Sequence, residues 1–331
     1  MTDTRLDVLA IGNAIVDVIA AADDSLIEEE GLAKGSMRLI DAEEATRLYG
    51  RMGQARETSG GSAANTVAGL AALGLRAGFI GQVANDQLGE IFSHDIQGLG
   101  VEFKTPPSDG DVPTARCLIL VTPDAQRTMN TFLGASQGLP AAALDEQQIR
   151  DAAILYLEGY LWDPEEPRAA MERAIEVARE AGRKVAFTLS DSFCISRHRD
   201  GFLKLIEDGR VDILFANEAE ILALTGEEDF EAAVTNAAAR VPLLVVTRSE
   251  QGAIAIAGAE RAQVAAEPVD KVVDTTGAGD LFAAGFLAGQ AQRRSLEDSL
   301  RMGAIAAAEV ISHYGARPEA NLKALVAQRL G

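Results

Sequence analysis

Short apolar runs alternate with amphipathic stretches along the second half of the chain. Buried strands are expected at residues 153–157, 185–189, 211–215 and 243–246. Segments with helical spacing follow the first three runs, at residues 165–181, 196–207 and 218–224. The last run leads instead into an antiparallel pair, residues 253–257 and 262–265. Strands that alternate with helices of this length are typical of an α/β fold with a doubly wound, mostly parallel sheet flanked by helices.

The first part of the chain has a less regular pattern. It predicts strands at 6–11, 14–22, 36–40 and 77–83, helices at 24–32, 41–52, 62–73 and 86–97, and a hairpin of 114–121 with 127–132. Ala-rich helices follow at 278–290 and 295–312, and Pro318 precedes a final amphipathic helix. We therefore expect a large α/β unit from residues 1–12, 41–100 and 133–331. A small β-sheet lid is expected from residues 13–40 and 101–132.

The composition fits such a fold and narrows the classes of partner. The 331 residues are 47% apolar and 5% aromatic, and their net charge is 30 − 50 = −20. Nucleic acids and anionic membrane surfaces are bound by clustered Lys and Arg, and no such cluster stands out, so we expect neither partner. Any phosphate site must therefore be built locally, from backbone amides and a few cations.

The chain also carries signals about its compartment. No stretch reaches the roughly 18 consecutive apolar residues of a membrane-spanning helix. Asp3 and Asp7 lie where a signal peptide has Lys or Arg. Cys117 and Cys194 cannot form a disulfide framework, and the scattered histidines give no zinc pattern. We expect a cytoplasmic protein without a His and Cys metal cage.

The strongest local signal is the segment Asp274-Thr-Thr-Gly-Ala-Gly-Asp280, which leads into an apolar helix. Gly277 and Gly279 allow backbone amides to converge beside a helix N-terminus, where anions bind. A carboxylate at Asp280 would lie beside this anion site and could take a proton from an attacking hydroxyl. The alternative is a simple helix cap after a glycine turn.

Two further polar segments interrupt apolar sequence. Gly60-Gly61-Ser-Ala-Ala-Asn65 is a glycine turn that opens a helix, and Asn65 can hydrogen-bond the hydroxyls of a ligand. Without a ligand it is a tight turn with a surface Asn. Asn13 and Asp17 lie in an apolar run, where buried polar groups need partners. A ligand with several hydroxyls would supply them, and so would a turn capped by Asn13.

Polar residues also follow two predicted strands. Asn217 and Glu220 are three residues apart on one helical face, and their oxygens suit hydrated Mg²⁺. A helix cap with an acidic first turn is the simpler explanation of this pair. Thr247 ends a strand shortly before Gly252, where hydroxyls and amides often meet phosphates in α/β folds.

Two side chains outside these motifs can contribute to a ligand site. Arg127 lies on the predicted hairpin, from which it can reach a phosphate, although most surface arginines have no such role. Tyr160 can stack on a base or simply fill the seam between lid and core.

The order of these segments resembles the ribokinase family, also called the pfkB sugar-kinase family. Residues 274–287 match that family's second signature, and the Gly60–Asn65 turn, the Asn217–Glu220 pair and the Thr247 segment occur in the family's order. One departure is Val67, where the first signature usually has a small residue; it puts only local packing in doubt.

Within the family, the first polar segment is similar to that of the adenosine kinases. Its spacing is Gly12-Asn13-x-x-x-Asp17. Ribokinase-like members tend to have Asn at the position of Ile15, and fructokinase-like members often have Glu at the position of Asn13. The resemblance therefore favours a nucleoside over a simple sugar as the acceptor.

The family resemblance implies a role for each of these residues. Asp280 would be the general base on the acceptor hydroxyl, and the amides of Gly277, Ala278 and Gly279 would form an anion hole. The acceptor would be held by Asn13, Asp17, Gly60, Gly61, Asn65, Arg127 and Tyr160, with Arg127 on phosphate. ATP would contact Asn217, Thr247, Gly252, Thr275, Gly277 and Gly279. Mg²⁺ would be bound through water by Asn217 and Glu220.

The resemblance also implies a reaction and its partners. We expect an ATP-dependent kinase that phosphorylates the primary hydroxyl of a nucleoside, adenosine first, to give AMP and ADP. The helix at 302–312 would border the adenine of ATP, and a monovalent cation such as K⁺ would bind near Asp274 and Gly315, as in some relatives. Ribose or fructose is the alternative acceptor, and a catalytically weak nucleoside or sugar sensor is the alternative function. The lid allows a monomer or a homodimer.

Overall fold

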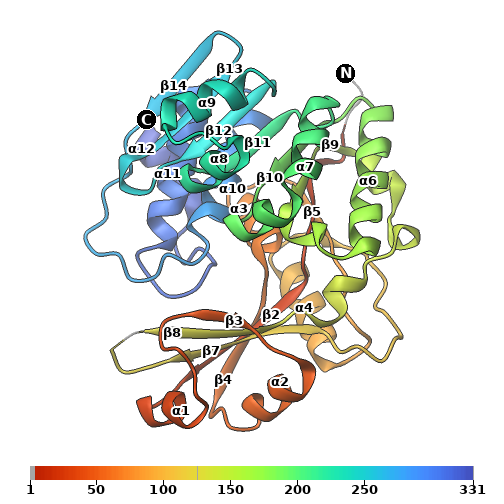
Figure 1. Cartoon of the computed structure of the whole chain (residues 1–331), viewed down its shortest axis with the longest axis vertical. Coiled ribbons are helices and arrows are strands. Elements are labelled where there is room, and N and C mark those ends of the chain that lie inside the picture. Colours follow the sequence, from red (N-terminus) through yellow and green to blue (C-terminus); the bar gives the residue numbers. More distant parts are fainter. Residues whose placement is uncertain (1–3, 125, 331) are drawn as a thin grey trace.

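A large sheet of nine strands runs through the part of the chain that the computed structural model describes, residues 4–124 and 126–330. Its order is β14-β13-β12-β11-β10-β9-β1-β5-β6 (Figure 1). The pairs β12–β13 and β13–β14 are antiparallel, and the other pairs of this sheet are parallel. The strands are β1 (Leu6–Ile11), β5 (Ala77–Ile80), β6 (Glu102–Phe103), β9 (Ala152–Glu158), β10 (Lys184–Thr188), β11 (Ile213–Asn217), β12 (Leu243–Thr247), β13 (Ala253–Ala257) and β14 (Glu260–Val264). The predicted mostly parallel sheet is confirmed.

Helices cover both faces of this sheet, because successive side chains of a strand point to opposite faces. Val8 and Ala10 of β1 belong to one apolar cluster, and Leu9 and Ile11 belong to another. The first cluster includes α3 (Ser62–Ala72), α4 (Gln87–Gly98), α10 (Ala278–Ala291), α11 (Leu296–Val310) and α12 (Leu322–Leu330). The second includes α5 (Glu146–Arg150), α6 (Glu165–Glu180), α7 (Ser192–Glu207), α8 (Glu218–Thr225) and α9 (Phe230–Ala238).

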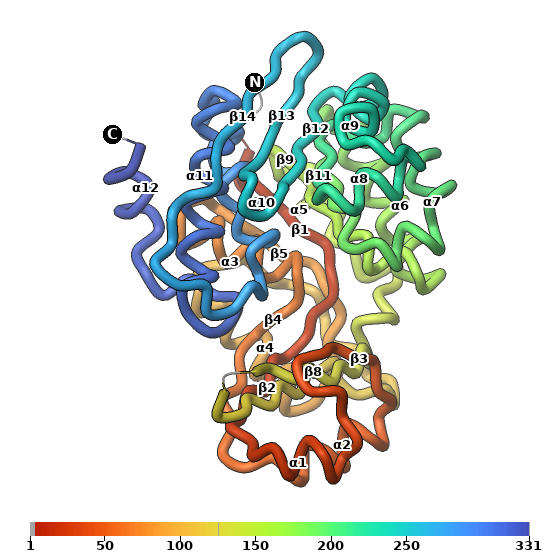
Figure 2. The backbone as a smooth tube through the Cα atoms, turned by 60° about the vertical axis from the view of Figure 1, so that its left-hand side comes forward, coloured from red at the N-terminus to blue at the C-terminus, as the bar shows by residue number. Residues whose placement is uncertain are grey.

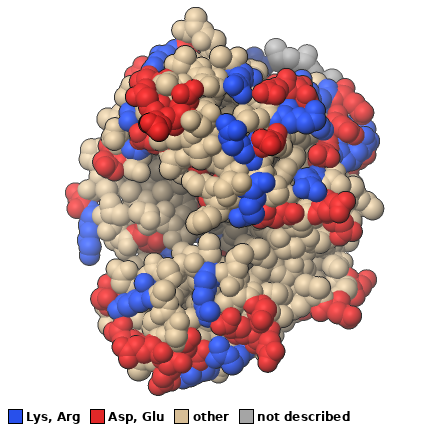
Figure 3. Space-filling view, viewed as in Figure 1, with Lys and Arg blue, Asp and Glu red and all other residues tan. Residues whose placement is uncertain are grey.

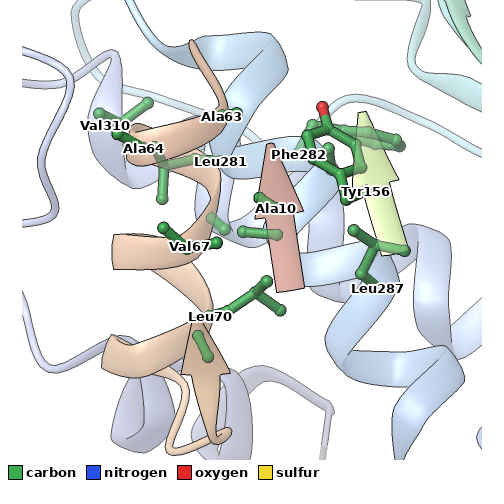
Figure 4. Packing of buried hydrophobic residues seen from close by; sticks show 14 of the residues in the cluster. Ala10, Ala63, Ala64, Val67, Leu70, Tyr156, Leu281, Phe282, Leu287 and Val310 are labelled. Carbon is green, nitrogen blue, oxygen red and sulfur yellow. The ribbon is translucent and has the colours of Figure 1, made fainter. Parts of the chain in front are cut away.

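Small residues bring α3 and α10 close together. Figure 4 shows Ala64 and Val67 of α3 beside Leu281 of α10, near β1. A Cβ on Gly69 would lie 2.6 Å from a methyl carbon of Leu281, so the helices approach as far as glycine allows. Val67 is fully buried in this contact. The close packing brings together the N-terminal ends of both helices, which carry residues of the site.

A second, smaller sheet has the order β3-β8-β7-β2-β4 in the described residues. Its strands are β2 (Ile15–Ala21), β3 (Met37–Leu39), β4 (Ala55–Gly60), β7 (Ala115–Val121) and β8 (Arg127–Phe132). Helices α1 (Asp24–Glu29) and α2 (Ala42–Tyr49) lie below this sheet in Figures 1 and 2. Single turns of 3₁₀-helix occur at η1 (Gly134–Gly138), η2 (Ala141–Ala143), η3 (Gly159–Trp162) and η4 (Ser249–Gln251).

Two strands differ from the expected lid boundaries. The sequence pattern predicts no strand at 55–60, yet β4 pairs with β2 in the small sheet. This edge strand reads ARETSG and has little apolar pattern, because backbone hydrogen bonds to β2 hold it in place. Conversely, β6 lies in a segment expected in the lid but pairs with β5 of the large sheet. The division of the chain into two domains stays a prediction.

Across the described ranges, no helix is both long enough and apolar enough to span a bilayer.

Candidate active site

A cavity of about 410 Å³ lies between the small sheet and the large one, and Figure 3 shows a hollow in the middle of the molecule. The small sheet contributes Ile15, Asp17, Cys117, Met129 and Thr131. The opposite wall comes from the carboxyl ends of β10, β11 and β12 and from the loop before α10, with Thr188, Phe215, Asn217, Glu220, Thr247, Thr275, Thr276, Gly277, Ala278, Gly279 and Asp280. Ligands of open α/β sheets usually bind at these strand ends.

Asp280 lies in the first turn of α10 and lines this cavity. The Ser62 hydroxyl donates to its Oδ1 at 2.6 Å, and the Asn65 amide donates to its Oδ2 at 2.9 Å. Burial raises the pKa of Asp280 above its ordinary value, whereas the two hydrogen bonds and the charge of Arg317 lower it. The first turn of α3 therefore orients a carboxylate that can accept a proton.

The glycine loop before Asp280 turns as the sequence predicts. Gly277 has a φ of 79°, and a Cβ there would lie 2.6 Å from the Ala316 Cβ, so only glycine fits. The Ala278 amide donates to the Thr275 carbonyl at 3.2 Å and is therefore partly used. The amides of Gly279 and Asp280 lie in the first helical turn, where N–H groups have no partner within the helix. An anion would meet these two amides first.

Asp17 reaches the cavity because the glycines opposite it leave room. A Cβ on Gly60 would lie 2.6 Å from the carboxyl carbon of Asp17. Gly61 has a φ of 98°, and a Cβ there would lie 2.2 Å from the Asn13 carbonyl oxygen. Burial raises the pKa of Asp17 to about 6, and the charges of Arg317 and Arg127 limit the rise. Gly61 thus lines the cavity, and the lack of a side chain at Gly60 leaves room for the Asp17 carboxyl group.

Asn13 is occupied by protein partners rather than left open to a ligand. Its backbone amide and its Nδ2 both donate to Glu158 Oε1 at 2.7 Å. Its Oδ1 accepts from the Ser136 hydroxyl at 2.8 Å and the Gln137 amide at 2.9 Å. Glu158 also accepts from the Ala63 amide at 2.8 Å, and burial raises the pKa of Glu158 to about 7. Asn13 thus fixes the entry into β2, and its contact with sugar hydroxyls stays a prediction.

Asn217 and Glu220 form the helix cap that the sequence left open as the simpler explanation. Asn217 Oδ1 accepts from the Glu220 amide at 2.9 Å, and Glu220 Oε2 accepts from the Asn217 amide at 3.0 Å. Asn217 Nδ2 also donates to Glu220 Oε1 at 2.6 Å. Burial raises the pKa of Glu220 to about 7. Both residues line the cavity beside Thr247, so a metal held through water remains compatible with the cap.

Arg127 and Gly252 have other contacts than those expected from the sequence. The Arg127 guanidinium forms a buried ion pair with Asp274, so a phosphate contact would require it to leave that partner. A Cβ on Gly252 would lie 2.0 Å from the Val264 carbonyl oxygen. This glycine lets the end of β14 pass close to the start of β13 and is not among the cavity-lining residues, although Thr275 is.

A second cavity, of about 310 Å³, shares Ile15, Ser62, Thr131 and Tyr160 with the first. Its other walls include Met37, Leu39, Leu133, Phe193, Asn13, Glu158, Asp163, Asp191 and Arg197. Met37, Leu39 and Phe193 are 55%, 62% and 74% exposed, which is unusual for large apolar side chains. The hydroxyl of Tyr160 donates to the Ser190 carbonyl at 3.3 Å, so its ring separates the two cavities in a fixed orientation. An apolar surface therefore adjoins the polar site.

Sequence reasoning gave no role to three residues that shape the site. Ser62 holds Asp280, and its place inside the glycine-turn motif was the available signal. Arg317 donates to the carbonyls of Ser59 and Ala64 at 2.6 Å each and lowers the pKa of Asp17 and Asp280 by its charge. Arg317 belongs to no motif, and Phe193 ends the segment 188–193, which resembles adenosine kinases but gave Phe193 no role of its own.

Comparison with known proteins agrees with this geometry. The pfkB family of carbohydrate kinases matches residues 6–323. The crystal structure of adenosine kinase from Sinorhizobium meliloti is 51% identical, with a TM-score of 0.90 over 98% of this chain and 99% of that one. A probable sugar kinase from Rhizobium etli CFN 42 is 49% identical, with the same TM-score and coverage.

Curated relatives are more distant. Guanosine-inosine kinase of Escherichia coli K12 is 29% identical over 90% of this chain, and the match spans 64% of that protein's length. Because the family match covers nearly the whole chain and includes every segment that lines the two cavities, the chain belongs to the pfkB family of carbohydrate kinases.

Proposed function

We propose that this protein is an ATP-dependent kinase that transfers a phosphoryl group to the primary hydroxyl of a nucleoside, with adenosine as the preferred acceptor. One observation carries the proposal. The cavity that contains Asp280 and Asp17 adjoins a second cavity walled by Met37, Leu39 and Phe193, and the two share Ile15, Ser62, Thr131 and Tyr160 as lining residues. Ribose hydroxyls suit the carboxylate of Asp17, and the faces of a base suit the apolar walls.

Asp280 is the proton acceptor of the proposed reaction. Ser62 and Asn65 hold its carboxylate in the cavity, where a primary hydroxyl of the acceptor would meet it. The proton of that hydroxyl passes to Asp280 as the hydroxyl oxygen bonds to the transferred phosphorus, and ADP leaves. The amides of Gly279 and Asp280, in the first turn of α10, would stabilise the charge that develops on the phosphoryl oxygens. Positioning and electrostatics supply the rate in such transfers.

The opposite end of the larger cavity suits the phosphate donor. Asn217, Glu220, Thr247 and Thr275 line it with oxygens and with a hydroxyl at the end of β12. The residues fit a hydrated Mg²⁺, which keeps most of its waters and needs few protein oxygens. Because Asn217 and Glu220 already bond to each other, they would hold the ion through its waters. When bound, Mg²⁺ would neutralise charge on the ATP phosphates.

The apolar walls of the second cavity favour a nucleoside over a free sugar. A sugar is covered with hydroxyls, and those placed against Leu39 or Phe193 would lose their hydrogen bonds to water without replacement. The names of related proteins do not decide between the two acceptors, since an adenosine kinase and a probable sugar kinase have 51% and 49% sequence identity to this chain. The exposed apolar wall is what favours the nucleoside.

The experiment compares the wild-type protein with Phe193→Ala. We expect wild type to convert ATP and adenosine into ADP and AMP, identified by chromatography. Phe193→Ala should raise the KM for adenosine by roughly tenfold, since base–aromatic stacking is worth about 1–3 kcal/mol. The matched control is Tyr49→Ala, which removes an aromatic side chain of α2 that bonds to Glu57 and lines neither cavity. Adenosine binding without AMP formation would support the sensor, and an unchanged KM in Phe193→Ala would contradict a base on this wall.

A further inference from the structure

The loop before the anion site contains a buried carboxylate, Asp274, whose two oxygens are both engaged. Its Oδ1 accepts from the amide and the hydroxyl of Thr276, at 3.0 and 2.7 Å. Its Oδ2 accepts from the Gly315 amide at 2.9 Å and from the guanidinium of Arg127. Only 7% of the Asp274 side chain and 8% of the Arg127 side chain are exposed. This is therefore an ion pair shielded from solvent.

The family resemblance implies a monovalent cation at this place, near Asp274 and Gly315. Such an ion needs oxygens with free lone pairs and no positive group beside them. Here N–H and O–H donors point at both oxygens of Asp274, and one donor carries a full positive charge. The residues present do not fit a bound K⁺ at the Asp274 carboxylate.

We propose that Arg127 takes the place of a monovalent cation at Asp274, so that this protein works without K⁺. The guanidinium supplies the positive charge that neutralises Asp274 and keeps both of its oxygens in place. Asp274 in turn holds Thr276, which directly precedes Gly277, and it holds the turn at Gly315. Arg127 is thus a positioning residue for the anion site, and it acts through Asp274.

The ion pair also connects the two sheets. Arg127 is the first residue of β8 in the small sheet, whereas Asp274 and Thr276 belong to the loop that precedes α10. The pair can form only while the small sheet lies over the larger cavity. The positive charge of Arg127 therefore reaches Asp274 only when the lid covers the cavity. A dissolved cation could bind Asp274 at any position of the lid. Removing either partner leaves a buried charge uncompensated, which is strongly destabilising.

The first test uses the ligand-free full chain and does not depend on the proposed function. Arg127→Gln and Asp274→Asn should each lower the midpoint of thermal unfolding. The double variant should lower it no further than the worse single variant, because both changes remove the same pair. Arg47→Gln is the matched control, since its ion pair with Glu30 joins α2 to α1. In a double variant, the decrease in the thermal midpoint caused by Arg47→Gln should add to the decrease caused by Asp274→Asn. Additive effects of Arg127→Gln and Asp274→Asn would overturn the proposal.

The second test rests on the proposed kinase function. Wild-type rates should be equal in KCl, NaCl and choline chloride at the same ionic strength, and stimulation by K⁺ alone would overturn the proposal. Arg127→Ala should lower kcat by roughly 10–100-fold through a displaced anion site, and guanidinium chloride should restore part of the loss. A raised KM for ATP with unchanged kcat would place Arg127 on phosphate and overturn the proposal. Absence of any phosphoryl transfer would count against the proposed function only, and the unfolding test would then decide.

Discussion

Asp280 combines two properties that a proton acceptor in phosphoryl transfer needs. Its oxygens accept hydrogen bonds from Ser62 and Asn65, which belong to another helix, so its orientation does not depend on its own backbone. Burial raises its pKa, which strengthens it as a base. The simple cap that the sequence left open does not describe this residue, because the N-cap of α10 is Gly277.

Replacing Asp280 by Asn should separate catalysis from folding. Asp280→Asn keeps the shape of the side chain but cannot take the proton, so kcat should fall at least ~10²-fold, the low end for a lost general base. The thermal midpoint should change little. Asp298→Asn, in the first turn of α11, is the matched control and should keep the wild-type rate. A near-wild-type kcat in Asp280→Asn would remove this residue from the base role.

Glu158 gives the stability of the protein a distinctive pH dependence. Burial raises its pKa from 4.5 to about 7, so between these values the folded chain binds more protons than the unfolded chain. The free energy of unfolding should therefore fall as pH rises through this window. In urea titrations at several pH values, the free energy of unfolding of Glu158→Gln should decline less steeply with pH than that of the wild type. The decline that remains in the variant comes from Asp17 and Glu220, whose pKa values are also raised by burial. An identical decline in the variant would contradict this assignment.

Several residues that the sequence motifs single out line one cavity. The glycine loop and Asp280 lie at the start of α10, Thr247 ends β12, and Asp17 lies within β2. Asn13 has a similar polar signal, and it bonds to Glu158, Ser136 and Gln137 through long-range contacts that leave no local trace in the sequence, while its contact with a ligand stays a prediction. Gly252 is a glycine for a packing reason alone.

At the scale of elements, two helix N-termini meet at the centre of the site. Helix α3 supplies Ser62 and Asn65, and α10 supplies Asp280 together with the first-turn amides of Gly279 and Asp280, which have no partner within the helix. Glycines at the turns set the direction of both helices. Apolar periodicity located these helices and the parallel strands, since burial imposes it. It missed β4, because an edge strand held by backbone bonds to β2 needs no apolar face.

Helix α8 allows a test of the proposed metal site. Glu220→Gln retains the capping geometry, since Gln also serves in capping boxes, but removes the charge. The Mg²⁺ concentration for half-maximal rate should rise, because a hard cation loses a charged oxygen beyond its waters. Raising the pH through about 7 ionises Glu220, so the Mg²⁺ concentration that gives half-maximal rate should fall over that range in the wild type. In Glu220→Gln, this concentration should not depend on pH in the same way. The same Mg²⁺ dependence in both proteins would leave the pair as a helix cap only.

At the scale of the whole molecule, each of the two sheets contributes different residues to the site. The elements of the large sheet carry the glycine loop and Asp280, and the small sheet carries Asp17, Leu39 and Arg127. The chain is acidic overall, with net charge −20, and Figure 3 shows groups of Asp and Glu interspersed with Lys and Arg on this face. Because the overall field repels anions, the proposed binding of an anionic donor depends on local amides and cations.

The most direct test of this account is the ratio of kcat/KM for adenosine to kcat/KM for ribose, measured with saturating ATP and Mg²⁺. The account predicts at least ~10² in favour of adenosine, which corresponds to about 2.7 kcal/mol of transition-state binding by the apolar wall. Asp17→Ala should lower kcat/KM for adenosine and leave the affinity for a non-hydrolysable ATP analogue, measured by calorimetry, nearly unchanged. A value for ribose or fructose equal to that for adenosine would contradict the nucleoside assignment and favour a sugar kinase.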